Sequence, residues 1–178
     1  MKLLKRILLV VLLIPILLVL VSLFLPSKYR VERSVTMRAR PETVFPHINT
    51  LKHWPEWTAW TVAKYPDMKV SFAGPETGVG ATYRWDGKST GQGTLKLTRS
   101  DVNKSIGYDL DFENGKYVST GAIVLEPAGD SVRIIWSNEG QLGWNPVSRV
   151  FGLFMDKMMG PDFEEGLRNL QQKVEVKP

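Results

Sequence analysis

A chain of 178 residues is long enough for one domain of ordinary size and a short appendage. Its 43% hydrophobic and 23% charged residues exclude an intrinsically disordered protein, and the absence of cysteine excludes disulfides and thiolate zinc sites. The net charge is +5, but three cations lie in the first six residues. The remainder is nearly neutral, so we expect no nucleic-acid partner.

Residues 7–25, ILLVVLLIPILLVLVSLFL, form an uncharged and almost wholly aliphatic run. As a helix this run would extend roughly 28 Å, nearly the hydrocarbon thickness of a bilayer. A cleaved signal peptide is the alternative, but its apolar core is usually about 7–15 residues long and ends in small residues. This run ends in Leu23, Phe24 and Leu25. We therefore expect residues 1–27 to be an uncleaved N-terminal membrane anchor with one transmembrane helix.

The charges on the two sides of the run only weakly indicate which way the anchor crosses the membrane. Three cations precede the run, and three more follow it closely, between residues 28 and 33. The positive-inside rule is therefore nearly balanced. We favour a single-pass membrane protein with its domain on the extracytoplasmic side, the common signal-anchor arrangement.

The spacing of the apolar residues changes twice within residues 29–60. Alternation over residues 31–37 predicts a half-buried strand. Pro41 then suits the first turn of a helix, whose apolar positions continue to Leu51, and Pro46 should shorten or kink that helix. Three tryptophans follow at positions 54, 57 and 60.

The middle of the chain predicts an antiparallel meander. Alternating segments near 68–72, 79–85, 93–99, 106–112, 118–125 and 132–136 are separated by turn sequences. The strongest of these turn sequences is Asn114-Gly115, which is typical of a tight hairpin. Successive tight turns imply a sheet with one apolar face and one solvated face.

The last part of the chain predicts a long amphipathic helix. Asn145 is a good N-cap and Pro146 a good first residue. Gly160-Pro161 interrupts the apolar stripe, which predicts either one helix bent near Gly160 or two consecutive helices. We expect the whole stripe to be buried against the sheet: Val147, Val150, Phe151, Phe154, Met155, Met158, Met159, Phe163, Leu167, Leu170 and Val174.

This order of elements resembles the helix-grip fold of the START/Bet v 1 superfamily, and it is similar to the SRPBCC proteins called polyketide cyclase/dehydrase-like. The resemblance covers about residues 29–175 and rests on VERSVTMRARPETVFPHINTLKHWPEWTAW, on Gly78 to Ala81 entering a strand, on Trp136 and on the closing helix. It implies an α+β domain over 28–178, with a curved antiparallel sheet wrapped on a long C-terminal helix. It also implies an internal cavity, without a shared catalytic motif.

A large set of apolar side chains should point into this domain, and it either packs solid or lines a ligand cavity. Methionines at helical spacing favour a core on their own, whereas the resemblance favours a cavity. Trp60 is the best gate candidate, Trp54 and Trp57 read as a plug or as bilayer contacts, and Glu139 is placed to fix a polar head group or to act as a base. The expected ligand-binding residues are Trp60, Tyr83, Trp85, Tyr108, Phe112, Trp136, Glu139, Phe151, Met155 and Met158.

Catalytic and metal motifs are not found in the sequence. His47 and His53 are the only histidines and have no third ligand, so we expect no metal and no cofactor. Asp109, Asp111 and Glu113 alternate on one strand face, which is more simply a solvated surface than an acid/base pair. The sequence contains no Ser-His-Asp order, HExxH motif, P-loop or dinucleotide-binding fingerprint.

The sequence therefore favours a membrane-tethered binding module that holds a hydrophobic or amphipathic small molecule, lipid-like or polyaromatic. A cyclase or dehydratase acting in the same cavity is one alternative, since a shaped cavity can act largely by folding its substrate. An interaction module with a solid core is the other alternative.

Overall fold

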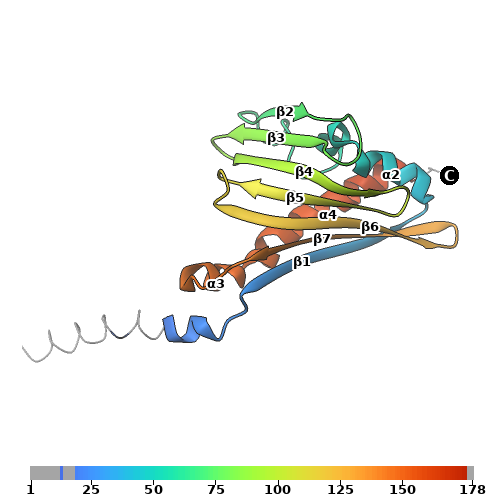
Figure 1. Cartoon of the computed structure of the whole chain (residues 1–178). Helices are drawn as coiled ribbons and strands as arrows, with labels where there is room; N and C mark the ends of the chain where they lie inside the picture. Colours follow the sequence, from blue (N-terminus) through green and yellow to red (C-terminus); the bar gives the residue numbers. More distant parts are fainter. Residues whose placement is uncertain (1–12, 14–18, 176–178) are drawn as a thin grey trace, which may run out of the picture.

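The computed structural model describes residue 13 and residues 19–175. These residues form an α+β domain in which one antiparallel sheet has a helix packed across one face (Figure 1). The elements are β1 (Lys28–Met37), α2 (Pro41–Asn49), the 3₁₀ helix η1 (Leu51–Glu56), β2 (Lys69–Ala73), β3 (Thr82–Gly87), β4 (Gly91–Asp101), β5 (Ser105–Phe112), β6 (Tyr117–Ala128), β7 (Ser131–Gln141), α3 (Pro146–Gly152) and α4 (Met155–Val174).

The sheet has seven strands in the order β1-β7-β6-β5-β4-β3-β2, and every neighbouring pair is antiparallel. Strands β2 to β7 are joined by successive hairpins, which confirms the predicted meander. Between β5 and β6, Asn114 and Gly115 both have positive φ, as the Asn-Gly turn requires. The first strand pairs with the last, so Arg33 lies opposite Trp136.

The core lies between the sheet and α4. Alternate residues of each strand share one face because the side-chain period of a strand is two. Trp136 on β7 points to the face that α4 covers, since its ring stacks on Phe163 of α4. We call this the inner face. Phe163, Leu167 and Leu170 supply the helix side of the core, and each is at most 2% exposed. This part of the predicted helix–sheet packing is confirmed.

The segment before β2 follows the predicted strand–helix order. Pro41 is the first residue of α2, and Val44 and Ile48 are buried on one side of it. Pro46 lies inside α2, which ends three residues later at Asn49. η1 follows at once and carries Trp54, so the short α2 delivers the tryptophans to the inner face.

The C-terminal segment forms two helices, and the break lies at Leu153–Phe154, not near Gly160. The Asn145 side chain accepts hydrogen bonds from the N–H groups of Val147 and Ser148, as predicted for an N-cap. Gly160 lies inside α4, directly beneath the guanidinium of Arg33, where a Cβ would collide with it. Arg33 in turn pairs with Asp156 at 2.7 Å and Glu164 at 2.6 Å. Gly160 therefore makes room for a β1–α4 ion-pair cluster and does not end the helix, which continues to Val174.

The prediction that the whole apolar stripe is buried is wrong for its first half. Val147, Phe151, Phe154 and Met158 are 76%, 49%, 52% and 53% exposed. For the residues of α3 the physical reason is position: this helix lies at the end of the sheet where β7 stops at Gln141, so no strand covers it (Figure 1).

Most of the predicted anchor lies outside the described residues. Of its run, Leu13 and residues 19–25 are described, with Val19 to Leu23 helical and a short connection through Ser27 to β1. No helix within the described part of the chain combines the length and the apolar character needed to span a bilayer.

Candidate functional site

The interior between the sheet and α4 is filled by aromatic side chains, which we call the tryptophan core: Trp54, Trp57, Trp136 and Phe163. Trp136 stacks on Phe163 with ring centroids 4.1 Å apart, and Trp54 and Trp57 meet its edge at 6.0 and 5.3 Å. Trp54, Trp57 and Trp136 are at most 3% exposed. The interpretation of Trp54 and Trp57 as a plug is confirmed.

Each indole N–H of the tryptophan core has an acceptor. Trp136 Nε1 donates to the hydroxyl of Tyr108 at 2.9 Å, and Trp54 Nε1 donates to the carbonyl of Ile48 at 2.9 Å. Trp57 Nε1 donates to the carbonyl of His47 at 3.2 Å. Burial raises the pKa of Tyr108 to about 12, so its hydroxyl stays neutral. With dense packing and satisfied donors, the tryptophan core is a solid part of the structure.

A second aromatic group lines the inner face nearer the β2 edge, and we call it the aromatic ladder: Phe72, Tyr83, Trp85, Phe112 and Tyr117. Consecutive ring centroids are 5.4, 5.7, 6.3 and 6.3 Å apart. The register explains the sequence of contacts, because Phe72 pairs with Tyr83 and Phe112 with Tyr117. Tyr83 is buried, but Phe72 is 38% and Tyr117 52% exposed. Unlike the tryptophan core, the aromatic ladder presents apolar surface.

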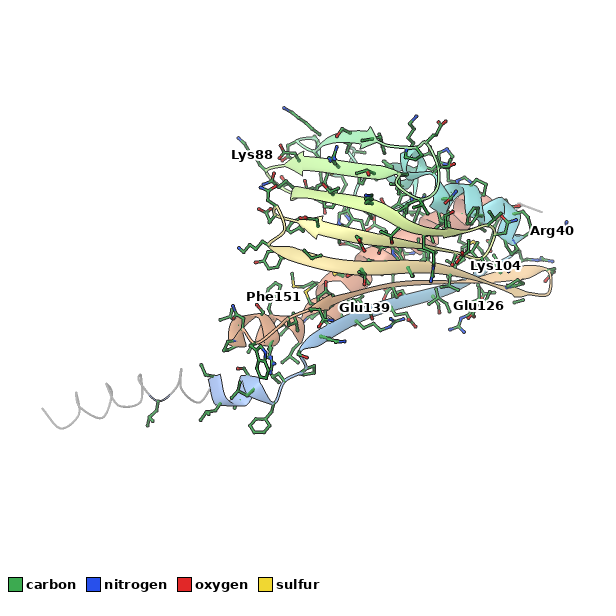
Figure 2. The ribbon with its side chains drawn as sticks, in the orientation of Figure 1. Arg40, Lys88, Lys104, Glu126, Glu139 and Phe151 are labelled. Atoms are coloured by element: carbon green, nitrogen blue, oxygen red, sulfur yellow. The ribbon has the colours of Figure 1, made fainter. Side chains whose placement is uncertain are left out.

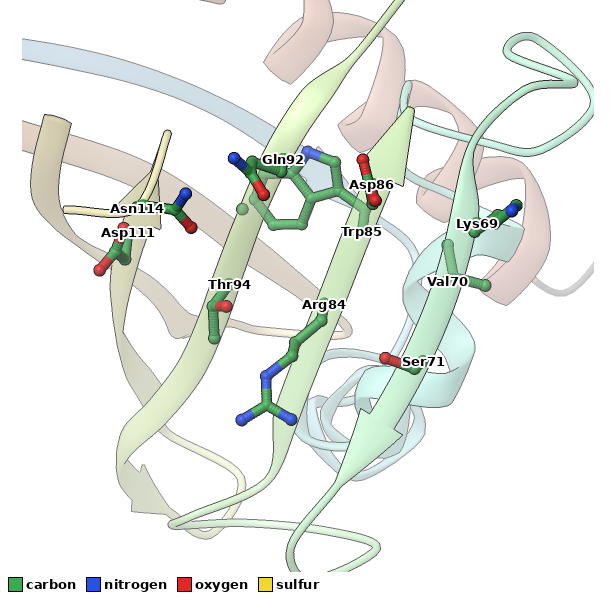
Figure 3. Close-up of a pocket in the computed structure, with 11 residues that line it drawn as sticks. Lys69, Val70, Ser71, Arg84, Trp85, Asp86, Gln92, Thr94, Asp111 and Asn114 are labelled. Atoms are coloured by element: carbon green, nitrogen blue, oxygen red, sulfur yellow. The ribbon is translucent and has the colours of Figure 1, made fainter. Parts of the chain in front are cut away.

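Glycine makes room for the middle of the aromatic ladder. Gly93 of β4 lies between Trp85 and Phe112 in the register, and a Cβ there would collide with the Trp85 indole. The indole therefore extends from β3 across Gly93 of β4, and Figure 3 shows it between these two strands, beside Gln92.

The aromatic ladder contains one buried polar atom with no protein partner. No hydrogen-bonding group of the described residues reaches the hydroxyl of Tyr83. Burial raises the pKa of Tyr83 to about 12, so it remains a neutral donor and acceptor. An unsatisfied buried hydroxyl costs on the order of 1–3 kcal/mol, which a polar group of a bound molecule would recover.

A polar cluster separates the tryptophan core from the open end of the sheet. Tyr29 donates to Asn138 Oδ1 at 3.2 Å, and Asn138 Nδ2 donates to Ser119 Oγ at 3.1 Å. Asn138 follows Trp136 by two residues on β7 and so shares its face. The inner face thus runs from a closed apolar core, through these amide and hydroxyl groups, to half-exposed aromatic rings.

The structure divides the predicted ligand residues into three groups. Tyr108 and Trp136 belong to the closed interior, and Trp60 and Met155 are partly buried against it, with Trp60 6.3 Å from both Trp136 and Phe163. Tyr83, Trp85 and Phe112 come together in the aromatic ladder. Glu139, Phe151 and Met158 point away from the interior: Glu139 is exposed and pairs with Arg30 at 3.2 Å, and the other two side chains are exposed.

Sequence reasoning missed Phe72, Tyr117, Tyr29, Ser119 and Asn138. A usable signal existed for one of them, because a tight turn at Asn114-Gly115 places Tyr117 opposite Phe112. The polar cluster depends on the β1–β7 and β6–β7 registers, which no local pattern specifies.

Open grooves also occur on the surface of the described residues. One, of about 450 Å³, crosses β2, β3 and β4 and is lined by Lys69, Arg84, Asp86 and Asp111 among others (Figure 3). Another, of about 690 Å³, lies between the start of α2 and the β4–β5 turn. The first mixes cations and anions on the solvated side of the sheet and so favours no single ligand charge.

The two histidines lie closer together than the sequence suggested. Their ring centroids are 5.6 Å apart, and burial lowers the pKa of His47. Among the described residues, however, no three metal-ligating side chains form a group.

These features can be compared with known proteins. The family described as polyketide cyclase/dehydrase and lipid transport matches residues 28–175, which is nearly the whole sheet–helix domain. The chain belongs to this family. No curated protein matches the sequence.

Solved structures share the fold of this polyketide cyclase/dehydrase family member. Protein CV1439 from Chromobacterium violaceum is 15% identical, with a TM-score of 0.59 over 85% of this chain and 99% of its own. Protein jhp0584 from Helicobacter pylori is 11% identical, with a TM-score of 0.62 over 82% and 88% of the two chains. Ara h 8.0201 is 15% identical, with a TM-score of 0.55 over 83% and 97%. These likenesses establish the Bet v 1-like helix-grip fold that the sequence predicted.

Proposed function

We propose that this protein binds a hydrophobic or amphipathic small molecule on the inner face of the sheet, along the aromatic ladder. The observation that carries the proposal is the combination of half-exposed rings with the unpartnered Tyr83 hydroxyl. Binding sites for such molecules are mostly apolar, with a few polar groups that fix orientation. The rings would cover an acyl chain or an aromatic system, while Tyr83 or Asn138 would hold its polar group.

Binding is favoured over catalysis at this site. The only ionisable groups in the aromatic ladder are the phenols of Tyr83 and Tyr117, and burial keeps the first of these neutral. A proton-transfer role at neutral pH usually requires a group with a pKa near that pH. Glu139, the candidate base, is exposed and paired with Arg30.

The same proposal includes a membrane tether. The motivation is the uncharged run 7–25, followed by only two residues before β1 begins at Lys28. Residues 1–27 would anchor the protein in one pass, and the domain over 28–178 would lie on the extracytoplasmic side, close to the bilayer. Such a position suits a module whose ligand is lipid-like.

A photoactivatable fatty acid tests the binding site in the membrane-bound full chain. After illumination, mass spectrometry of peptides should place the crosslinks on β3, β5 and the start of β6. Trp85→Ala should reduce this labelling strongly, because the central ring of the ladder is lost. Arg84→Ala, one residue away on the outer side of the same strand, is the matched control and should retain it. Equal labelling in both variants, or crosslinks confined to residues 13–25, would contradict the proposed site.

A further inference from the structure

Exposed apolar side chains gather at one end of the molecule, in two stretches that are far apart in sequence. We call this surface the interfacial patch: Leu20, Val21, Leu23, Phe24, Trp144, Val147, Phe151, Leu153 and Phe154. Phe24 is 90%, Trp144 80% and Val147 76% exposed. Soluble surfaces rarely expose contiguous apolar areas of this kind unless something binds there.

The two halves of the interfacial patch are held together by Arg149 of α3. Its Nη1 donates to the carbonyls of Ser22 at 3.2 Å, Leu23 at 3.0 Å and Leu25 at 3.4 Å, and its Nε donates to the carbonyl of Gly143 at 2.8 Å. Although its side chain is charged, Arg149 is only 5% exposed. Its guanidinium also lies 5.1 Å from the centre of the Trp144 ring.

This contact has a clear electrostatic reason. Residues 19–23 are helical, and the last carbonyls of a helix lack intrahelical partners and carry a partial negative charge. A guanidinium offers several donors in a fixed plane and so satisfies more than one of these carbonyls. Arg149 therefore caps the end of the apolar segment and fixes it against α3. The segment joins the domain through a defined contact, in addition to the chain at Pro26 and Ser27.

The chemistry of the adjoining chain identifies the partner of the interfacial patch. The helical turn that Arg149 caps is the end of the run 7–25, which has no charge or strong polar group apart from Ser22. Residues 144–155, which supply the other half, contain one charged residue, and it is the buried Arg149. An exposed tryptophan beside an apolar helical face is typical of the bilayer interface.

We propose that the interfacial patch docks on the surface of the bilayer that receives residues 7–25, with α3 lying in the interfacial layer and Arg149 fixing the orientation of the domain. This inference rests on the proposed tether and adds to it a defined docking face. A tether alone leaves the domain free to rotate; the Arg149 contact and α3 together hold one end of the sheet at the lipid.

The docking face determines which part of the proposed ligand site lies near the membrane. Strands β3, β5 and β7 run in the same direction, so all three end on the side where α3 begins. Figure 2 shows Lys88, in the β3–β4 turn, and Phe151 at one end of the sheet, with Arg40 and Lys104 at the other. Phe112 and Tyr117 flank the β5–β6 turn at the α3 end. The aromatic ladder therefore opens toward the bilayer, which favours a ligand taken directly from the lipid phase.

Site-directed fluorescence on the full chain tests the docking face. Because the sequence lacks cysteine, one introduced cysteine gives a single labelling site. Environment-sensitive labels would be placed in turn at Leu13, Val147 and Val102, the last being 70% exposed in the β4–β5 turn at the opposite end. In phosphatidylcholine liposomes with a headgroup-proximal spin-labelled quencher, we expect a blue shift and quenching at position 147, and neither at position 102.

The label at Leu13 distinguishes a wrong docking face from a wrong membrane tether. If position 13 is protected by lipid but position 147 behaves as in water, the tether stands and the docking face is wrong. If position 13 is also water-exposed, the tether itself fails. Energy transfer between differently labelled copies, with position 147 protected even in detergent, would show that a second copy covers the patch and would overturn the lipid assignment.

Two variants test the parts of the docking face separately. Phe151→Asp changes an exposed side chain, so the fold should persist while lipid quenching at position 147 is lost. Arg149→Ala should reduce quenching at position 147 but leave position 13 protected, whereas Arg133→Ala, an exposed arginine of β7, should change neither. Unchanged quenching at position 147 in Arg149→Ala, with the variant folded by circular dichroism, would overturn the orienting role of Arg149.

Discussion

The inner face carries two aromatic groups that are built from the same residue types and differ in what covers them. Trp136 lies under α4, stacks on Phe163 and donates its N–H to Tyr108. Trp85 extends across Gly93 in the aromatic ladder and is only partly buried. Aromatic content alone therefore does not define a ligand site; the uncovered group is the one with free surface and an unpartnered hydroxyl. Matched substitutions in the two groups test this difference.

The largest contrast is expected between the two tryptophans. Trp136→Ala should lower the free energy of unfolding by about 3–5 kcal/mol, because it opens a cavity in a packed core. Trp85→Ala should cost less than about 2 kcal/mol, since its ring already contacts solvent. Urea unfolding of the full chain in mild detergent, followed by circular dichroism, measures both. Equal losses would mean that the aromatic ladder is core.

Alkaline pH should weaken the fold through the buried phenols. The pKa of Tyr108 is raised from 10.0 to about 12, so the folded state keeps a proton that the unfolded state loses. Stability is therefore full below pH 10 and falls as pH rises toward 12, by up to about 1.4 kcal/mol per pH unit for this residue. Unfolding midpoints of wild type and Tyr108→Phe between pH 9 and 12 test this. A wild-type slope no steeper than that of the variant would contradict it.

Adding a methyl group at a glycine should also lower stability more in the closed interior than in the aromatic ladder. A Cβ at Gly121 meets the buried Tyr108 ring, whereas one at Gly93 meets the Trp85 indole. Gly121→Ala should cost about 1–3 kcal/mol, as overpacking of a core does. Gly93→Ala should cost less, because a partly exposed indole has room to turn away, but it should disturb fatty-acid crosslinking. Thermal unfolding and the crosslinking yield give the two readings.

The smallest single effect is expected at Tyr83. Tyr108→Phe leaves the buried N–H of Trp136 without its acceptor and should cost about 1–3 kcal/mol at neutral pH. Tyr83→Phe removes a hydroxyl without a protein partner, so stability should stay the same or rise. The same Tyr83→Phe change should weaken binding of a ligand with a polar head more than that of a pure hydrocarbon. Equal destabilisation by the two changes would show that Tyr83 has a partner in the folded protein.

Much of the fold was predictable because local chemistry specifies it. Pro41 begins α2, Asn145 caps α3, and Asn114-Gly115 forms the turn between β5 and β6, each as its residue type favours. The prediction that the helix is interrupted near Gly160 was wrong for a physical reason. In sequence it interrupts a helix, but in the fold it accommodates Arg33 from β1, more than a hundred residues earlier.

The sequence by itself determined which side chains are apolar and at what period, and this was enough for an antiparallel meander, a closing helix and the helix-grip family. Tertiary structure alone decided which apolar surfaces are covered. The stripe of the C-terminal segment continues through α3 and α4, yet its residues are buried only from Phe163 onward, and α3 lies at the end of the sheet where β7 stops at Gln141. The same holds for the aromatic residues, whose division into a closed tryptophan core and an open aromatic ladder depends on strand register and on the path of α4. Periodicity reports the face on which a side chain lies, but burial depends on what lies opposite, and that is set by contacts between distant parts of the chain.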